Sequence, residues 1–123
     1  MSKILISLNE PRIIEYMSGK KEWYLNGQKH REDGPAVEWS SGSKEWWLNG
    51  QKHRDTGPAV EYSNGTKSWY LNGKRHRLDG PAIEYSVGTK SWYLNGQKYK
   101  FNEWAKQVGW SREQIAEWLL INE

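Results

Sequence analysis

Histidine and glutamate recur at equal spacing in this sequence, and both residue types can coordinate a metal ion. The residues are His30, His53 and His76, and Glu38, Glu61 and Glu84. Zinc holds its nitrogen ligands at ~2 Å. We expect equivalent residues to lie three strands apart in a sheet, which separates neighbouring histidines by ~14 Å. The sequence therefore predicts no metal site, and instead a histidine stacked on the tryptophan of the neighbouring strand.

Catalytic residue types are present, but not in an arrangement that catalysis requires. The chain has no cysteine, which excludes disulfide bonds, thiol catalysis and thiolate metal ligands. It contains no nucleophile elbow, phosphate-binding loop or dinucleotide fingerprint. Glu38 and its equivalents recur once per repeat, whereas an active site needs an asymmetric cluster. We therefore expect no enzymatic activity, no catalytic residue and no cofactor.

Aromatic and cationic residues that could bind a partner also recur regularly. The residues expected on one solvent-facing side of a sheet are Tyr24, Arg31, Trp47, Arg54, Tyr70, Arg77 and Tyr93. These residue types are enriched at protein interfaces, and alternating rings and cations also bind single-stranded nucleic acid or anionic lipid headgroups. The net charge of +3 permits an acidic partner without requiring a polyanion. An ordinary solvated sheet face has the same composition, so this alternative stays open.

A repeat of 23 residues must position all of these side chains. Full copies begin at Gly19, Gly42 and Gly65, a partial fourth copy begins at Gly88, and half a copy precedes the first. Each copy contains an Asn-Gly pair, which is a strong signal for a two-residue hairpin turn. The glycines of these pairs are Gly27, Gly50, Gly73 and Gly96. Further turn signals at Asp33-Gly34-Pro35 and Asn64-Gly65 divide each copy into three short strands.

Counting outward from the turns predicts which side chains share a face. If the turns have two residues, Tyr24 faces Lys29 and Val60 faces Trp69. Alternation then predicts one packing face and one solvent face, with the lysines and Glu38 on the solvent face. The packing face would hold Trp23, Trp46, Trp69 and Trp92 as structural residues, with the equivalents of Leu25 and His30, and Val37, Val60, Ile83, Trp39, Tyr62 and Tyr85.

The strings WYLNG, KHR, DGPA and EYS-x-G at this period resemble MORN-type repeats, in the divergent form of bacterial and bacteriophage proteins. The resemblance covers roughly residues 13–100, although Arg31, Arg54 and Arg77 stand where glycine is common. It implies a rolled or elongated β-meander that acts as a scaffold or binding module. It also implies a small interaction protein of the antitoxin-like or host-directed kind.

The two ends differ from the repeat. Residues 1–12, with the apolar run Ile4 to Leu8, are expected to form an N-terminal capping strand, and residues 13–100 the array. Residues 101–123 have helical periodicity and are expected to cap the other end. The tail also resembles a DNA-binding helix-turn-helix in the string WAKQVGWSREQIAEWL, where Arg112 and Gln114 would contact the partner. Its two basic and four acidic side chains give a net charge of −2, which favours a cap over a DNA reader.

The sequence thus predicts a mainly β protein, an antiparallel meander of hairpin repeats with a short α-helical C-terminal cap. We expect a non-enzymatic module that binds and blocks or sequesters a protein partner. The alternative is nucleic-acid or anionic-lipid binding through the stripe or the tail, and self-association through sheet edges is a third possibility. No stretch is long and apolar enough to be a signal sequence or a membrane span, so we expect a cytoplasmic location.

Overall fold

Four Asn-Gly pairs form the tight turns of the molecule. In the computed structural model, which describes residues 10–122, Asn26, Asn49, Asn72 and Asn95 have φ between 50° and 54°, and the glycines that follow have φ between 74° and 84°. Positive φ at both central residues defines a type I′ turn, whose twist matches that of the flanking strands. The hairpins therefore pair as counting predicted, with Tyr24 opposite Lys29 and Leu25 opposite Gln28.

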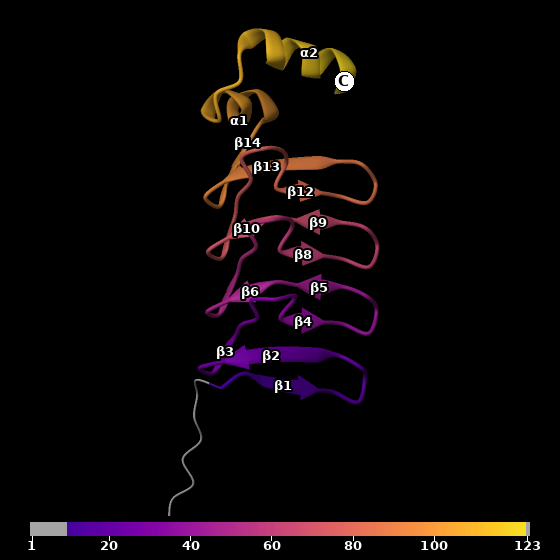
Figure 1. Cartoon of the computed structure of the whole chain (residues 1–123). Coiled ribbons are helices and arrows are strands. Elements are labelled where there is room, and N and C mark those ends of the chain that lie inside the picture. The colour runs from indigo at the N-terminus through magenta and orange to yellow at the C-terminus, as the bar shows by residue number, and fades with distance from the viewer. Residues whose placement is uncertain (1–9, 123) are drawn as a thin grey trace, which may run out of the picture.

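The hairpins stack into one elongated array with two helices at its C-terminal end (Figure 1). Within residues 10–122 a ten-stranded antiparallel sheet has the order β1-β2-β4-β5-β8-β9-β12-β13-β14, and β3 pairs with β2. The hairpins β6–β7 and β10–β11 lie beside it as two-stranded sheets. The strands are β1 (Arg12–Glu15), β2 (Lys21–Leu25), β3 (Gln28–Lys29), β4 (Val37–Glu38), β5 (Lys44–Glu45), β6 (Trp47–Leu48), β7 (Gln51–Lys52), β8 (Val60–Glu61), β9 (Lys67–Ser68), β10 (Tyr70–Leu71), β11 (Lys74–Arg75), β12 (Ile83–Glu84), β13 (Lys90–Leu94) and β14 (Gln97–Tyr99). The predicted fold class, a meander of hairpin repeats, is confirmed.

The second and third copies each add two strands to the ten-stranded sheet, not three. β5 and β8 come from the second copy, and β9 and β12 come from the third. Equivalent residues of neighbouring copies are therefore ~9.6 Å apart, not ~14 Å. In these two copies the third strand, β7 or β11, lies in a hairpin beside the sheet. Counting residues in the sequence could not distinguish such a strand from a member of the sheet.

The turn between β8 and β9 has three residues, and the predicted register across it is wrong. The Tyr62 N–H donates to the Thr66 carbonyl, and the Gly65 N–H donates to the Tyr62 carbonyl. Val60 consequently lies opposite Ser68, not opposite Trp69. A shift of one residue moves every side chain of a strand to the other face of the sheet.

The side chains are therefore distributed over the two faces differently from the prediction. We call one side the tryptophan face, defined by Trp23, Trp46, Trp69 and Trp92. We call the other side the tyrosine face, defined by an inner row and an outer row of rings. The inner row is Tyr24, Trp47, Tyr70 and Tyr93, and the outer row is Tyr16, Trp39, Tyr62 and Tyr85. Val37, Val60 and Ile83 also lie on the tyrosine face, where they are buried.

Opposite charges alternate across the sheet on the tryptophan face. Lys21 pairs with Glu38, Glu38 pairs with Lys44, and Lys44 pairs with Glu61, and the alternation continues to Lys90. Such cross-strand pairs stabilise a sheet because the opposed Cβ atoms are close. These lysines and glutamates were predicted to lie beside Tyr24. Alternation along β2 places Lys21 with Trp23 instead, and the one-residue register shift explains why the glutamates also lie on the tryptophan face.

Two helices close the C-terminal end of the array. They are α1 (Phe101–Gln107) and α2 (Arg112–Asn122). Their buried residues Trp104, Ala105 and Ile115 form one apolar cluster with Trp92 of β13. The Trp104 indole also donates to the Arg77 carbonyl, at 3.0 Å. The predicted helical cap is confirmed, and it covers the last tryptophan of the tryptophan face.

The N-terminal capping strand stays a prediction, because residues 1–9 lie outside the described part of the chain. Arg12 begins β1, which pairs with β2 along its length. Within residues 10–122 neither helix has the length and the apolar composition that crossing a membrane requires.

Candidate binding surface

Three of the predicted binding residues, the arginines, are engaged inside the molecule. The Cζ atoms of Arg31, Arg54 and Arg77 lie 3.8–4.0 Å from the centres of the Trp23, Trp46 and Trp69 rings. They are therefore on the tryptophan face, opposite Tyr24. The prediction that they share a face with Tyr24 is wrong, because the chain leaves the strand after each histidine and alternation ends there.

Each arginine also bridges two loops of its own copy. In the second copy, one terminal nitrogen of Arg54 donates to the Pro58 carbonyl and to the Glu61 carboxylate, both at 3.0 Å. The same two bonds recur around Arg31 and Arg77. Charge-assisted hydrogen bonds of this kind are stronger than neutral ones. The arginines thus hold the Asp-Gly-Pro bend against the sheet.

A carboxylate provides a further contact in two of the three copies. The Nε atoms of Arg31 and Arg77 lie 2.9 Å from Asp33 and Asp79. The hydrogen bond from Arg31 and its positive charge lower the pKa of Asp33. Thr56 occupies the equivalent position in the second copy, so Arg54 has no such carboxylate partner among the described residues.

The histidines connect one copy to the next. The Nδ1 atom of His30 accepts a hydrogen bond from the Asn49 N–H at 2.9 Å, and His53 and His76 do the same for Asn72 and Asn95 at 3.0 Å. An imidazole that accepts through Nδ1 carries its proton on Nε2. This role differs from the stacking that the sequence predicted. Across residues 10–122 no cluster of three His, Asp, Glu or Cys residues is close enough to hold a metal ion.

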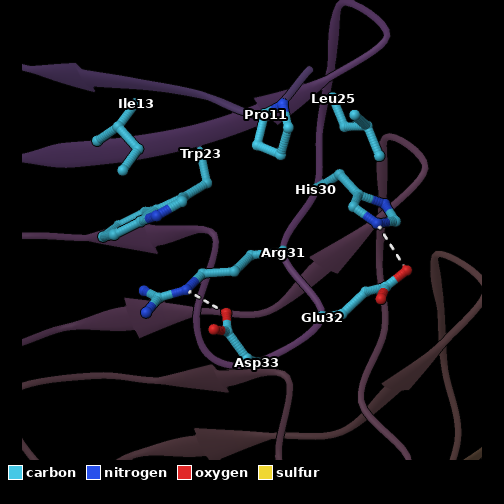
Figure 2. Close-up of a pocket in the computed structure, with 8 residues that line it drawn as sticks. All are labelled: Pro11, Ile13, Trp23, Leu25, His30, Arg31, Glu32 and Asp33. Carbon is cyan, nitrogen blue, oxygen red and sulfur yellow. Dashed lines mark hydrogen bonds and ion pairs between the residues drawn. The ribbon is translucent and has the colours of Figure 1, made fainter. Parts of the chain in front are cut away.

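A pocket of about 550 Å³ opens on the tryptophan face at its first copy. Figure 2 shows Trp23 with Pro11 and Ile13 on one side and the Arg31–Asp33 pair on the other. Its two acidic side chains are engaged by neighbours, Glu32 by His30 and Asp33 by Arg31. The pocket therefore presents mainly an indole ring and aliphatic groups.

Rings and cations alternate along the inner row of the tyrosine face. The Lys29 ammonium lies 4.8 Å from the Trp47 ring, and Lys52 lies 5.7 Å from Trp47 and 5.2 Å from Tyr70. The Arg75 guanidinium lies 5.6 Å from Tyr70 and 5.5 Å from Tyr93. Each cation thus sits between rings of successive hairpins. Tyr24, Trp47, Tyr70 and Tyr93 share one face, as the sequence predicted for these four.

The outer row of rings is the part of this surface that sequence reasoning missed. Tyr16, Trp39, Tyr62 and Tyr85 are between 41% and 48% exposed, although three of them were expected on the packing face. The string Ser-Asn-Gly at 63–65 was the available signal, because a three-residue hairpin loop commonly ends in a glycine with positive φ. Gly65 has that conformation, with φ of 95°.

Acidic side chains occupy the space between the two rows in the first two copies. Glu22 is 4% exposed and accepts a hydrogen bond from the Tyr16 hydroxyl. Burial raises the pKa of Glu22, but the Tyr16 hydrogen bond and the charges of Lys20 and Lys29 outweigh burial and leave the pKa lowered. The Glu45 carboxylate accepts from the indoles of Trp39 at 3.2 Å and Trp47 at 2.9 Å.

The helical tail holds the remaining predicted residues. Gln114 and Ser111 form a reciprocal capping box, with distances of 2.7 Å and 3.1 Å, so the Gln114 side chain is used at the start of α2. Two residues of the tail were predicted to contact a partner. Of these, Arg112 is exposed and forms no ion pair within residues 10–122, whereas Gln114 caps α2.

No family model, curated protein or solved structure matches this chain. The meander of short antiparallel hairpins is compatible with a MORN-like repeat fold.

Proposed function

We propose that the chain is a non-enzymatic protein-binding module whose interface is the tyrosine face. The observation that carries the proposal is the double row of rings with cations between the inner ones. Tyrosine, tryptophan and arginine dominate binding energy at protein interfaces. Rings already held by their neighbours lose little conformational entropy when a partner binds, so the surface is organised in advance.

The same alternation of rings and cations supports a second candidate, the binding of single-stranded nucleic acid. Glu22 and Glu45 lie within this surface and lower its positive potential in the first two copies. A protein partner, which can complement both signs of charge, fits this mixed surface better than a polyanion does.

The finer parts of the proposal rest on the resemblance to MORN-type repeats. They are a bacterial or bacteriophage origin, a cytoplasmic partner, and a mode of action in which binding blocks or sequesters that partner. Adding the purified chain to an assay of the purified partner tests the last point, and unchanged partner activity at saturation argues for scaffolding instead.

The test compares partner recovery by the tagged chain and by two variants. Tyr62→Ala with Tyr85→Ala removes two outer rings, and Leu78→Ala removes an exposed side chain from a loop of the third copy, to which Tyr85 also belongs. We expect one stoichiometric protein to be retained by the wild type and by Leu78→Ala after nuclease treatment at moderate salt, with at least tenfold weaker binding by the double variant. Equal affinity of all three for that protein would exclude the tyrosine face. Recovery of nucleic acid only at low salt would favour the second candidate.

A further inference from the structure

One position on the tyrosine face changes its chemistry halfway along the array. It lies between the inner and outer rows and is occupied by Glu22, Glu45, Ser68 and Ser91 in successive copies. Each of these side chains is on the same face as its buried neighbours Val37, Val60 and Ile83, because they are directly paired across the strands. The first two copies therefore carry a carboxylate where the last two carry a hydroxymethyl group.

In the first copy this carboxylate neutralises the cation of its own hairpin. A Glu22 oxygen lies 3.7 Å from the Lys29 ammonium and 3.6 Å from the Lys20 ammonium. In the second copy, the Glu45 carboxylate instead accepts from two indoles. In both copies the space between the two rows is filled by a carboxylate that the chain itself supplies.

In the third copy the equivalent space is a cavity with unpaired donors. It has a volume of about 300 Å³, lies between Tyr62 and Tyr85, and has Thr66, Ser68 and Arg75 in its wall. Ser68 is 3% exposed. The Ser68 hydroxyl and the Arg75 Nε are buried and have no hydrogen-bond partner in the described part of the chain. Arg75 stands at the position of Lys29. Glu22 pairs with Lys29, whereas among residues 10–122 no carboxylate pairs with Arg75.

Buried polar groups without partners are rare, because each has given up its hydration without gaining a hydrogen bond. Ser68 and Arg75 line the same cavity, so their hydroxyl and Nε–H, unpartnered among the described residues, suit one acceptor group. A carboxylate suits them best, because the side chains of Glu22 and Glu45 fill the equivalent space in the first two copies.

We propose that the cavity formed by Tyr62, Ser68, Arg75 and Tyr85 binds a carboxylate from an acidic side chain of the protein partner. The inference rests on the proposed function, because it names the group that the tyrosine face recognises. In the third copy the partner's carboxylate fills the space between the two rows and pairs with Arg75, as Glu22 does with Lys29 in the first copy. The first two copies are closed to such a ligand by their own glutamates.

The direct test follows the Arg75 Nε–H signal by nuclear magnetic resonance, with the signal assigned through Arg75→Lys. The probe is N-acetylglutamate N-methylamide, which carries one side-chain carboxylate. Its matched neutral control is N-acetylglutamine N-methylamide, and inorganic phosphate is the third arm. We expect a saturable downfield shift with the glutamate probe only. No shift, an equal shift with the glutamine analogue, or tighter binding of phosphate would overturn the assignment.

A variant supplies the carboxylate from inside the chain. Ser68→Glu should place a carboxylate beside Arg75, abolish the response to the probe, and move the free Arg75 signal to where the probe moves it in the wild type. Ser91→Glu makes the same change one copy further on and should leave the Arg75 response intact. A probe response that persists in folded Ser68→Glu overturns the site. The titration of the wild type decides the matter if that variant does not fold.

The site and the proposed function can fail separately. If Tyr62→Ala with Tyr85→Ala weakens partner binding at least tenfold and Ser68→Glu leaves it unchanged, the tyrosine face remains the interface and the carboxylate site is wrong. If both changes weaken binding to a similar extent, both statements hold. If neither does, the proposed function fails, and the titration alone then decides whether the cavity binds carboxylates.

Discussion

At the scale of single residues, Arg54 and its equivalents connect groups that lie apart in the sequence. The guanidinium stacks on one indole and donates to a proline carbonyl and to a glutamate of the sheet. Stacking and in-plane hydrogen bonding use different directions of the same planar group, which lysine cannot reproduce. This geometry explains why a long charged side chain contributes to folding here and not to the surface that we propose for binding.

Replacing Arg54 by alanine should therefore destabilise the chain and spare partner binding. We expect a loss of about 1–3 kcal/mol, because the Pro58 carbonyl and the Glu61 carboxylate lose a charged donor. Urea unfolding followed by tryptophan fluorescence measures it. Arg112→Ala is the control, since that exposed arginine should change stability by less than about 0.5 kcal/mol. Equal effects of the two substitutions would refute the structural role of Arg54.

Thr56→Asp should give the second copy the ion pair that the other two possess. The lowered pKa of Asp33 means that the folded state favours its ionised form. Such a group stabilises the fold above its unfolded pKa, and the gain is lost as the pH falls through the folded pKa. We expect a higher urea midpoint for Thr56→Asp at pH 7 and no difference from the wild type at pH 2. Thr56→Asn is the uncharged control, and a gain that persists at pH 2 would contradict the ion pair.

The sequence predicted residue types better than residue partners. The four Asn-Gly turns and the rings of the inner row follow from local patterns. The contacts of Arg54, and the hydrogen bond between His53 and Asn72 of the next copy, depend on how loops fold back onto the sheet. The cavity at Ser68 could not be predicted from the sequence either. It exists because a small side chain lies between two rows of rings, and the position of the outer row was not predicted.

At the scale of elements, the turn at residues 63–65 sets the register of β9 against β8. Hydrophobic alternation could not determine it, since both faces of this sheet are aromatic. Reading Asn64-Gly65 as a two-residue turn placed Trp69 opposite Val60, whereas the three-residue loop places Ser68 there. An error of one residue in the predicted register thus assigned side chains to the wrong face, although the pairing within the Asn-Gly hairpins was predicted correctly.

Two single-residue deletions should show separately how turn length and strand register affect the free energy of unfolding. Deleting Ser63 leaves Tyr62 opposite Thr66 across an Asn-Gly turn, and should cost less than about 1.5 kcal/mol through the lost hydrogen bond to Ser43. Deleting Thr66 moves Trp69 opposite Val60, and should cost more than about 3 kcal/mol because buried and exposed side chains exchange places. Urea unfolding compares them. Similar losses for both deletions would show that register does not control stability here.

At the scale of the whole molecule, each copy contacts mainly its neighbours, and the helical cap ends the series. In such an array, stability is approximately a sum of copy and interface contributions, and a terminal element protects the apolar surface of the last copy. Trp104 is 0% exposed and packs 4.5 Å from Trp92, centre to centre. It covers the last tryptophan as the arginines cover the other three. Helical periodicity predicted the cap. It did not predict that the Trp104 ring would cover Trp92 in the way that an arginine guanidinium covers each of the other three tryptophans.

Trp104→Ala should therefore loosen the array from its C-terminal end. We expect a loss of about 3–5 kcal/mol from truncating a buried tryptophan. Amide hydrogen exchange should show the largest loss of protection in β13 and β14, smaller losses in β9 and β10, and little change in β2. Leu120→Ala, at an 85% exposed position of α2, serves as the control. A uniform loss of protection along the chain would indicate one cooperative unit in place of a series.

The unbroken period also affects how such a chain can change over generations. Because copies join in register with no insertion between them, an unequal crossover between two copies in the gene yields a longer or shorter array with the same two ends. Each inherited copy brings either a glutamate or a serine to the position of Ser68. Recombination could thus alter the number and order of open and closed sites in one step, without new point mutations and without disturbing the fold.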